Sequence, residues 1–115
     1  MRNYQEQQVW QQAMVLAEMF YKITACFPDS EKFGLISQMR RAAVSVPSNI
    51  AEGYCRGSDA EFKRFLYISR GSLAELETQW IVSQRLRYCS YQQEVYDQIQ
   101  RVFALINGFI NHLKV

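Results

Sequence analysis

Residues 40–57 read RRAAVSVPSNIAEGYCRG, and their apolar side chains recur with the period of an α-helix. At about 100° per residue, the apolar positions of this stretch and of the residues just before it fall on one narrow stripe. The stripe consists of Ile36, Met39, Ala43, Val46, Ile50 and Tyr54. Such a stripe predicts an amphipathic helix whose apolar face is buried in a core.

The opposite stripe of the same helix is polar and consists of Arg41, Ser45, Ser48, Glu52 and Arg56. Small hydroxyl side chains let another backbone approach closely, and arginine and glutamate can form ion pairs across such a contact. The pattern fits a solvated face equally well. We hypothesise that these five residues form an oligomer interface.

Pro47 lies inside this helix, where a proline removes one backbone hydrogen bond and crowds the preceding turn. Because the apolar period continues from Val46 to Ile50, the sequence predicts one kinked helix instead of two. Ser45 and Ser48 flank the kink and are expected to satisfy the freed backbone groups.

Proline and glycine mark the ends of the first two predicted helices. The first helix is expected over about residues 4–26, because Pro28 pushes the residue before it out of the helical region. The second helix is expected to begin at residue 31 or 32 and to end between residues 54 and 56. Gly57 then suits a left-handed cap.

Two capping boxes predict where the third and fourth helices begin. Ser58 with Glu61 opens a helix that continues to about Leu86, and Ser90 with Gln93 opens the last one. In a capping box, the serine hydroxyl accepts a hydrogen bond from the backbone amide three residues later. The fourth helix is expected to run to the end of the sequence.

The predicted fold is all-α, an antiparallel up-down-up-down four-helix bundle that forms a single domain over residues 1–115. Short connections make consecutive helices antiparallel neighbours, and 115 residues with 49% hydrophobic content can bury one core. Gly71 lies in the middle of the third helix and costs about 1 kcal/mol relative to alanine. We expect another helix to cross closely there.

The sequence contains no constellation of residues that would support catalysis. It has no glycine-rich phosphate loop, no paired nucleophile and base, and only one histidine, His112. Cys26, Cys55 and Cys89 are far apart and are expected to be reduced thiols. We therefore predict a cytoplasmic protein that is not an enzyme, with no cofactor, no metal site, no small-molecule substrate and no membrane span.

Basic side chains in the second and third helices are candidates for nucleic-acid binding, although structural ion pairs explain such clusters as well. The candidates are Arg40, Lys63, Arg64, Arg70, Arg85 and Arg87. Arg85 and Arg87 have no acidic residue within four positions, which makes them the pair most available to phosphate. The net charge of +2 is modest, so folding or assembly would have to concentrate the positive charge.

Aromatic residues make up 14% of the sequence, more than a thin bundle needs for its core. Phe33 and Tyr67 are among them. This surplus suggests a subunit interface.

Three runs of sequence resemble one bacterial family. They are QMRRAAVSVPSNIAEG at residues 38–53, FKRFL at residues 62–66 and GSLAELETQ at residues 71–79. VWQQAM at residues 9–14 and FGL at residues 33–35 are similar too. Together they resemble the four-helix bundle family of 23S rRNA intervening-sequence proteins over nearly the whole chain.

The resemblance implies a bundle that assembles as a ring-like homopentamer. The accessory variability protein of diversity-generating retroelements is similar in fold and assembly, and it binds nucleic acid and a reverse transcriptase. The expected function is therefore that of a nucleic-acid-associated accessory protein, with rRNA, retroelement RNA or DNA, and a reverse transcriptase as partners. The alternative is a protein-binding scaffold without direct nucleic-acid contact.

Overall fold

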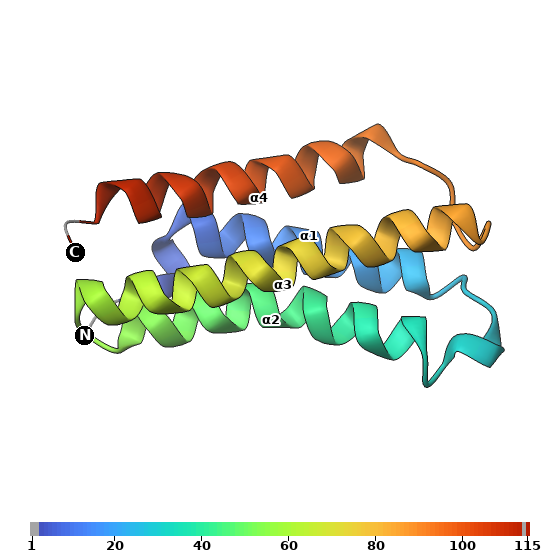
Figure 1. Ribbon diagram of the computed structural model, residues 1–115, viewed down its shortest axis with the longest axis horizontal. Coiled ribbons are helices and arrows are strands. Elements are labelled where there is room, and N and C mark those ends of the chain that lie inside the picture. Colours follow the sequence, from blue (N-terminus) through green and yellow to red (C-terminus); the bar gives the residue numbers. More distant parts are fainter. Residues whose placement is uncertain (1–2, 114) are drawn as a thin grey trace.

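The computed structural model describes residues 3–113 and 115 and contains four long helices (Figure 1). They are α1 (Gln8–Thr24), α2 (Leu35–Cys55), α3 (Asp59–Arg85) and α4 (Gln93–His112), with short 3-10 turns η1 (Tyr4–Glu6) and η2 (Asp29–Glu31). This confirms the predicted all-α four-helix bundle.

The helices are arranged in a ring of neighbours. α2 and α3 lie side by side and form the most extensive helix pair, while α1 packs against α2 and α4, and α4 against α1 and α3. The bundle is elongated, with extents of 44 × 25 × 21 Å. The α1–α2 and α3–α4 connections lie together at what we call the two-loop end, and the α2–α3 connection lies at the opposite end (Figure 1).

The core consists of one apolar stripe from each long helix, as the period predicted. From α2 the stripe buries Met39, Ala43, Val46 and Ile50 almost completely. The other three helices contribute their own buried stripes, which include Leu16, Phe20, Leu66, Leu73, Trp80, Ile99 and Ile106. Dispersion and apolar burial over these residues hold the four helices together.

The predicted start of α2 was wrong by about one turn. Residues 29–31 form the 3-10 turn η2 and the helix begins only at Leu35. The Glu31 side chain explains the difference, because it lies outside the helix and caps it. Its Oε1 accepts a hydrogen bond from the Leu35 amide at 3.0 Å, and its Oε2 accepts one from the Tyr88 hydroxyl at 2.9 Å.

The hydrogen bond between Tyr88 and Glu31 is expected to make part of the free energy of unfolding depend on pH. The hydrogen bond to Glu31, with burial and the carboxylate charge, raises the pKa of Tyr88 above its ordinary value of 10. The folded protein therefore holds the phenol proton more tightly than the unfolded chain does. The resulting stability is present below about pH 10 and is lost as the pH rises through the folded-state pKa.

Urea unfolding measured between about pH 8 and pH 11 checks this expectation. The Tyr88→Phe variant should lack this alkaline component, whereas Tyr67→Phe, at an exposed tyrosine on α3, should retain it. Equal pH profiles for the parent protein and Tyr88→Phe would contradict the assignment.

For one predicted capping box the serine half is confirmed, while the Glu61 carboxylate bonds to Arg64; the other predicted box is wrong. The Ser58 hydroxyl accepts a hydrogen bond from the Glu61 amide at 3.2 Å, and Gly57 has the left-handed φ of 88° that was expected. Ser90, however, caps no helix, because α4 begins at Gln93 after an irregular segment. The Gln93 side chain bonds to Tyr91 and Asp97 instead of returning to Ser90.

The ends of α1 were predicted too far out on both sides. Tyr4–Glu6 forms the 3-10 turn η1, and the extended backbone of Gln7 separates it from the helix, which ends at Thr24 instead of residue 26. The Thr24 hydroxyl donates to the Phe20 carbonyl at 2.7 Å within the last turn.

Pro47 lies inside one continuous helix, as predicted. The extra hydrogen bonds near it come from other residues than expected. Asn49 Nδ2 donates to the Ser45 carbonyl at 2.8 Å, and Ser69 Oγ of α3 donates to the Val46 carbonyl at 2.8 Å. The Ser45 hydroxyl instead bonds to Ser72 of α3 at 2.9 Å, so it joins two helices.

Candidate nucleic-acid and subunit interfaces

The six candidate nucleic-acid residues do not form one patch. Five of them follow α3 from its first turns to just beyond its end, so that Lys63 and Arg85 are separated by roughly 33 Å along the helix axis. Arg40 lies on α2. The bundle therefore distributes these cations along its length, and each group has to be judged by its own contacts.

Arg40 is engaged within the chain. Its Nε donates to Thr24 Oγ1 at 2.9 Å and its Nη2 donates to the Tyr21 carbonyl at 3.2 Å. The guanidinium also lies 4.6 Å from the centre of the Tyr21 ring. These contacts fasten α2 to the last turn of α1, where a cation also favours the negative end of the helix dipole.

Two candidates on α3 bind other parts of the chain. Arg70 Nη1 donates to Asn107 Oδ1 of α4 at 2.8 Å, and its guanidinium lies over the Tyr67 ring. Lys63 Nζ donates to the Val115 carbonyl at 2.5 Å. Arg70 therefore links α3 to α4, and Lys63 links α3 to Val115.

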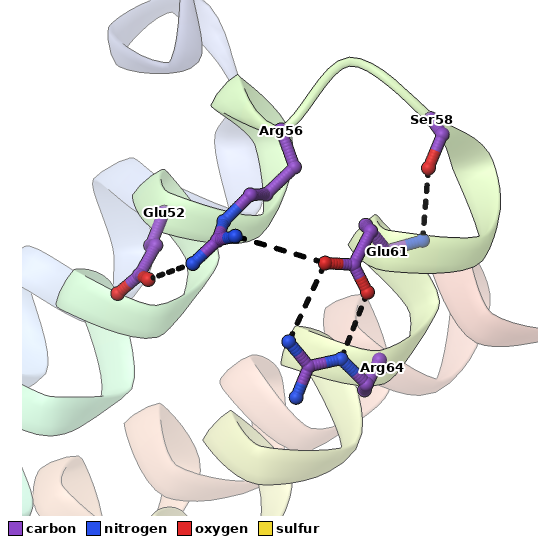
Figure 2. A network of polar contacts seen from close by, with 5 residues as sticks. All are labelled: Glu52, Arg56, Ser58, Glu61 and Arg64. Atoms are coloured by element: carbon purple, nitrogen blue, oxygen red, sulfur yellow. Dashed lines mark hydrogen bonds and ion pairs between the residues drawn. The ribbon is translucent and has the colours of Figure 1, made fainter.

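Arg64 belongs to a polar network that joins the end of α2 to the start of α3 (Figure 2). Arg56 pairs with Glu52 at 2.7 Å and approaches Glu61 at 3.8 Å. Arg64 Nε donates to Glu61 at 2.8 Å. The two guanidiniums also lie 5.1 and 4.5 Å from the centre of the Phe65 ring.

The network is electrically balanced, with two arginines and two glutamates. The hydrogen bond from Arg64 lowers the pKa of Glu61, and the same bond raises the pKa of Arg64. Because all four side chains are substantially exposed, each ion pair contributes little to stability. The sequence assigned Glu52 and Arg56 to a subunit interface and Arg64 to nucleic acid, but their contacts here are within one chain.

Arg85 and Arg87 differ from the other four candidates. Arg85 is exposed in the last turn of α3, and Arg87 is exposed just after it, with a left-handed φ of 65°. Within residues 3–113 and 115, neither guanidinium forms a hydrogen bond or an ion pair. The two-loop end of the bundle therefore carries two exposed arginines that have no such partner among the described residues.

The predicted interface residues are also divided by the fold. Ser45 is half-buried and bonds to Ser72 of α3, whereas Arg41 and Ser48 are exposed; all three line a depression on the side of α2 that faces Tyr21 of α1. The surface between α1 and α2 carries a groove of about 650 Å³, which we call the α1–α2 groove. Its apolar lining includes Trp10, Met14, Tyr21, Val44, Pro47 and Ala51.

The high exposure of the Phe33 side chain was not predicted from the sequence. Its side chain is 90% exposed, more than any other large apolar side chain of the described residues. It lines a shallow depression of about 680 Å³ that shares Tyr21, Val44 and Ser48 with the α1–α2 groove. Because the sequence predicted a helix from residue 31 or 32, the available signal was only that Phe33 lies outside the apolar stripe of that helix.

These features define a class of protein, an all-α four-helix bundle that carries a surface groove and two exposed arginines at one end. Residues 5–108 match the family model described as 23S rRNA-intervening sequence protein, and the chain belongs to this family. No curated protein matches it. Among the described residues, no helix is long and apolar enough to cross a membrane, and no group of three or more potential ligands could hold a metal ion.

Proposed function

We propose that this protein is a non-enzymatic, homo-oligomeric accessory protein that binds RNA through Arg85 and Arg87. The observation that carries the proposal is the pair of exposed and unengaged guanidiniums at the two-loop end. Arginine binds phosphate through two parallel hydrogen bonds, which suits it to an RNA backbone. The family description, which refers to an intervening sequence of 23S rRNA, supports RNA as the partner.

Assembly supplies what one chain lacks. A single chain has a net charge of +2, so the ring of five copies implied by the resemblance would carry five times +2, or +10. A ring also presents every copy of Arg85 and Arg87 in equivalent positions, and several weak contacts then act together. A cytoplasmic location and association with a reverse transcriptase belong to the same proposal.

The decisive test is an electrophoretic binding assay with structured RNA across a salt series. Replacing both Arg85 and Arg87 with alanine should weaken binding and flatten its salt dependence. We expect the slope of log affinity against log salt to fall by about 1 for each phosphate contact removed. Light scattering should show an unchanged oligomer mass, because both side chains are exposed and have no hydrogen bond or ion pair among the described residues.

The matched control replaces Lys63 and Arg64 with alanine. It removes the same number of positive charges from the same helix, but these two side chains are bonded to Val115 and Glu61. The control should have the smaller effect on RNA affinity. Equal salt curves for the parent protein and the Arg85/Arg87 variant would remove the basis for RNA binding at this end.

A protein-binding scaffold is the second candidate. It is favoured by the engagement of Arg40, Arg64 and Arg70 in contacts within the chain, which makes these three guanidiniums less available to phosphate. An intact oligomer that binds neither RNA nor DNA at low salt would support the protein-binding scaffold over the RNA-binding protein.

A further inference from the structure

Phe33 projects from the two-loop end with almost no contact to its own chain. It lies in the connection between η2 and α2, and the Lys32 ammonium lies 5.7 Å from the centre of its ring. Such exposure leaves the apolar area of the phenylalanine ring in contact with water. An isolated exposed aromatic of this kind is typical of an anchor that fills a pocket on a partner.

The α1–α2 groove has the size and lining that such an anchor requires. Aromatic and aliphatic side chains form its wall, and its volume of about 650 Å³ exceeds that of a phenyl ring several-fold. The groove reaches Pro47 and Ala51, whereas Phe33 precedes the first residue of α2. Pro47 lies 12 helical residues, or roughly 18 Å, beyond the start of α2. Phe33 lines the adjoining depression and not the groove, so its ring is not seated in the groove of its own chain.

Charges on the two surfaces are complementary. The segment of the anchor carries an exposed acid and an exposed base, Asp29 and Lys32. The groove also carries one of each, Glu18 and Lys22, and both are exposed. A second copy of this chain can thus satisfy both signs at once, which an uncharged apolar partner could not do.

We infer that Phe33 of one copy inserts into the α1–α2 groove of a neighbouring copy, with Lys32 facing Glu18 and Asp29 facing Lys22. This inference rests on the homo-oligomer of the proposed function and identifies its contact surfaces. The contact joins two different surfaces, head to tail, and a contact of this kind generates a ring where its rotation closes. Arg41 and Ser48 lie in the depression between anchor and groove and are covered when the copies meet.

The first test is the mass of Phe33→Ala in solution, measured by size exclusion with light scattering. Because Phe33 is 90% exposed, its removal should leave the helix content of the chain unchanged. We expect the assembly to dissociate towards the 13.5 kDa chain at concentrations where the parent protein is oligomeric. Tyr67→Ala, at another exposed aromatic, is the matched control and should retain the parent mass.

A charge exchange tests the pairing itself. Lys32→Glu and Glu18→Lys should each weaken assembly at least about tenfold, because like charges then face each other in the contact. The double variant restores opposite charges and should recover most of the affinity. Additive losses in the double variant would overturn the pairing of these two residues.

The outcomes separate this inference from the proposed function. A parent protein that is monomeric would overturn the homo-oligomer and the contact together. An oligomeric parent with an equally oligomeric Phe33→Ala variant would overturn only the contact. Because Arg85 and Arg87 are not part of the contact, the RNA assay tests the proposed function without relying on Phe33.

Discussion

Replacing Trp80 with alanine is expected to lower the free energy of unfolding by about 3–5 kcal/mol. Trp80 is 2% exposed and is the largest fully buried side chain. Its ring packs edge to face against Phe20 of α1, with 6.3 Å between the ring centroids. It also stacks on Tyr91 of the α3–α4 connection, with 5.6 Å between the centroids. Alanine would leave a cavity that three parts of the fold border, and a rigid bundle can close it only in part.

Urea unfolding at one fixed protein concentration measures this loss, since assembly makes stability depend on concentration. The control is Ile81→Ala, at the next residue of the same helix, which is 44% exposed and should change stability by no more than about 0.5 kcal/mol. A loss below about 1 kcal/mol for Trp80→Ala would contradict the role of this side chain as the centre of the core.

The fold could be predicted because burial repeats along each helix. Met39, Val46 and Ile50 are buried because of their positions on the helix, and that information is present in the spacing alone. The helix starts were less predictable, since they depend on which of several nearby side chains bonds to the free backbone amides of the first turn. Ser58 caps α3 as expected, but Glu31 caps α2 from outside the helix while it also accepts the Tyr88 hydroxyl from a connection 57 residues away.

The candidate site was less predictable than the fold for the same reason. A helical period places a cation on a face but does not identify its partner. Arg40 bonds to residues 16 and 19 positions earlier, and Arg70 bonds to a residue 37 positions later. These long side chains reach across helices, so only the packed structure distinguishes the engaged arginines from Arg85 and Arg87. The groove, too, exists only where α1 and α2 meet.

Glycine positions show how packing decides what the sequence leaves open. The sequence predicted a close helix crossing at Gly71, and this was wrong. A Cβ added at Gly71 would meet nothing within 4 Å, because the residue lies on the exposed face of α3. The close approach is at Gly53 instead, where an added Cβ would lie 2.4 Å from the Cβ of Phe65 and 3.4 Å from the Cα of Phe62.

Gly53→Ala is therefore expected to lower the free energy of unfolding by about 2 kcal/mol. Alanine has the better helix propensity by about 1 kcal/mol, but the Phe65 Cβ is fixed to the backbone of α3, so the two helices would have to move apart. Overpacking of this kind costs about 1–3 kcal/mol and more where backbone must shift. The Arg56–Glu61 contact crosses the same helix pair and would be disturbed with it.

Gly71→Ala is the matched control, since it makes the same chemical change inside a helix without a neighbour to displace. It should raise the free energy of unfolding by about 1 kcal/mol, through helix propensity alone. Both variants are compared by urea unfolding at the same protein concentration. Opposite signs are the expected result. Stabilisation of similar size by both substitutions would mean that α2 and α3 separate easily at Gly53, and that their contact there is looser than the 2.4 Å approach implies.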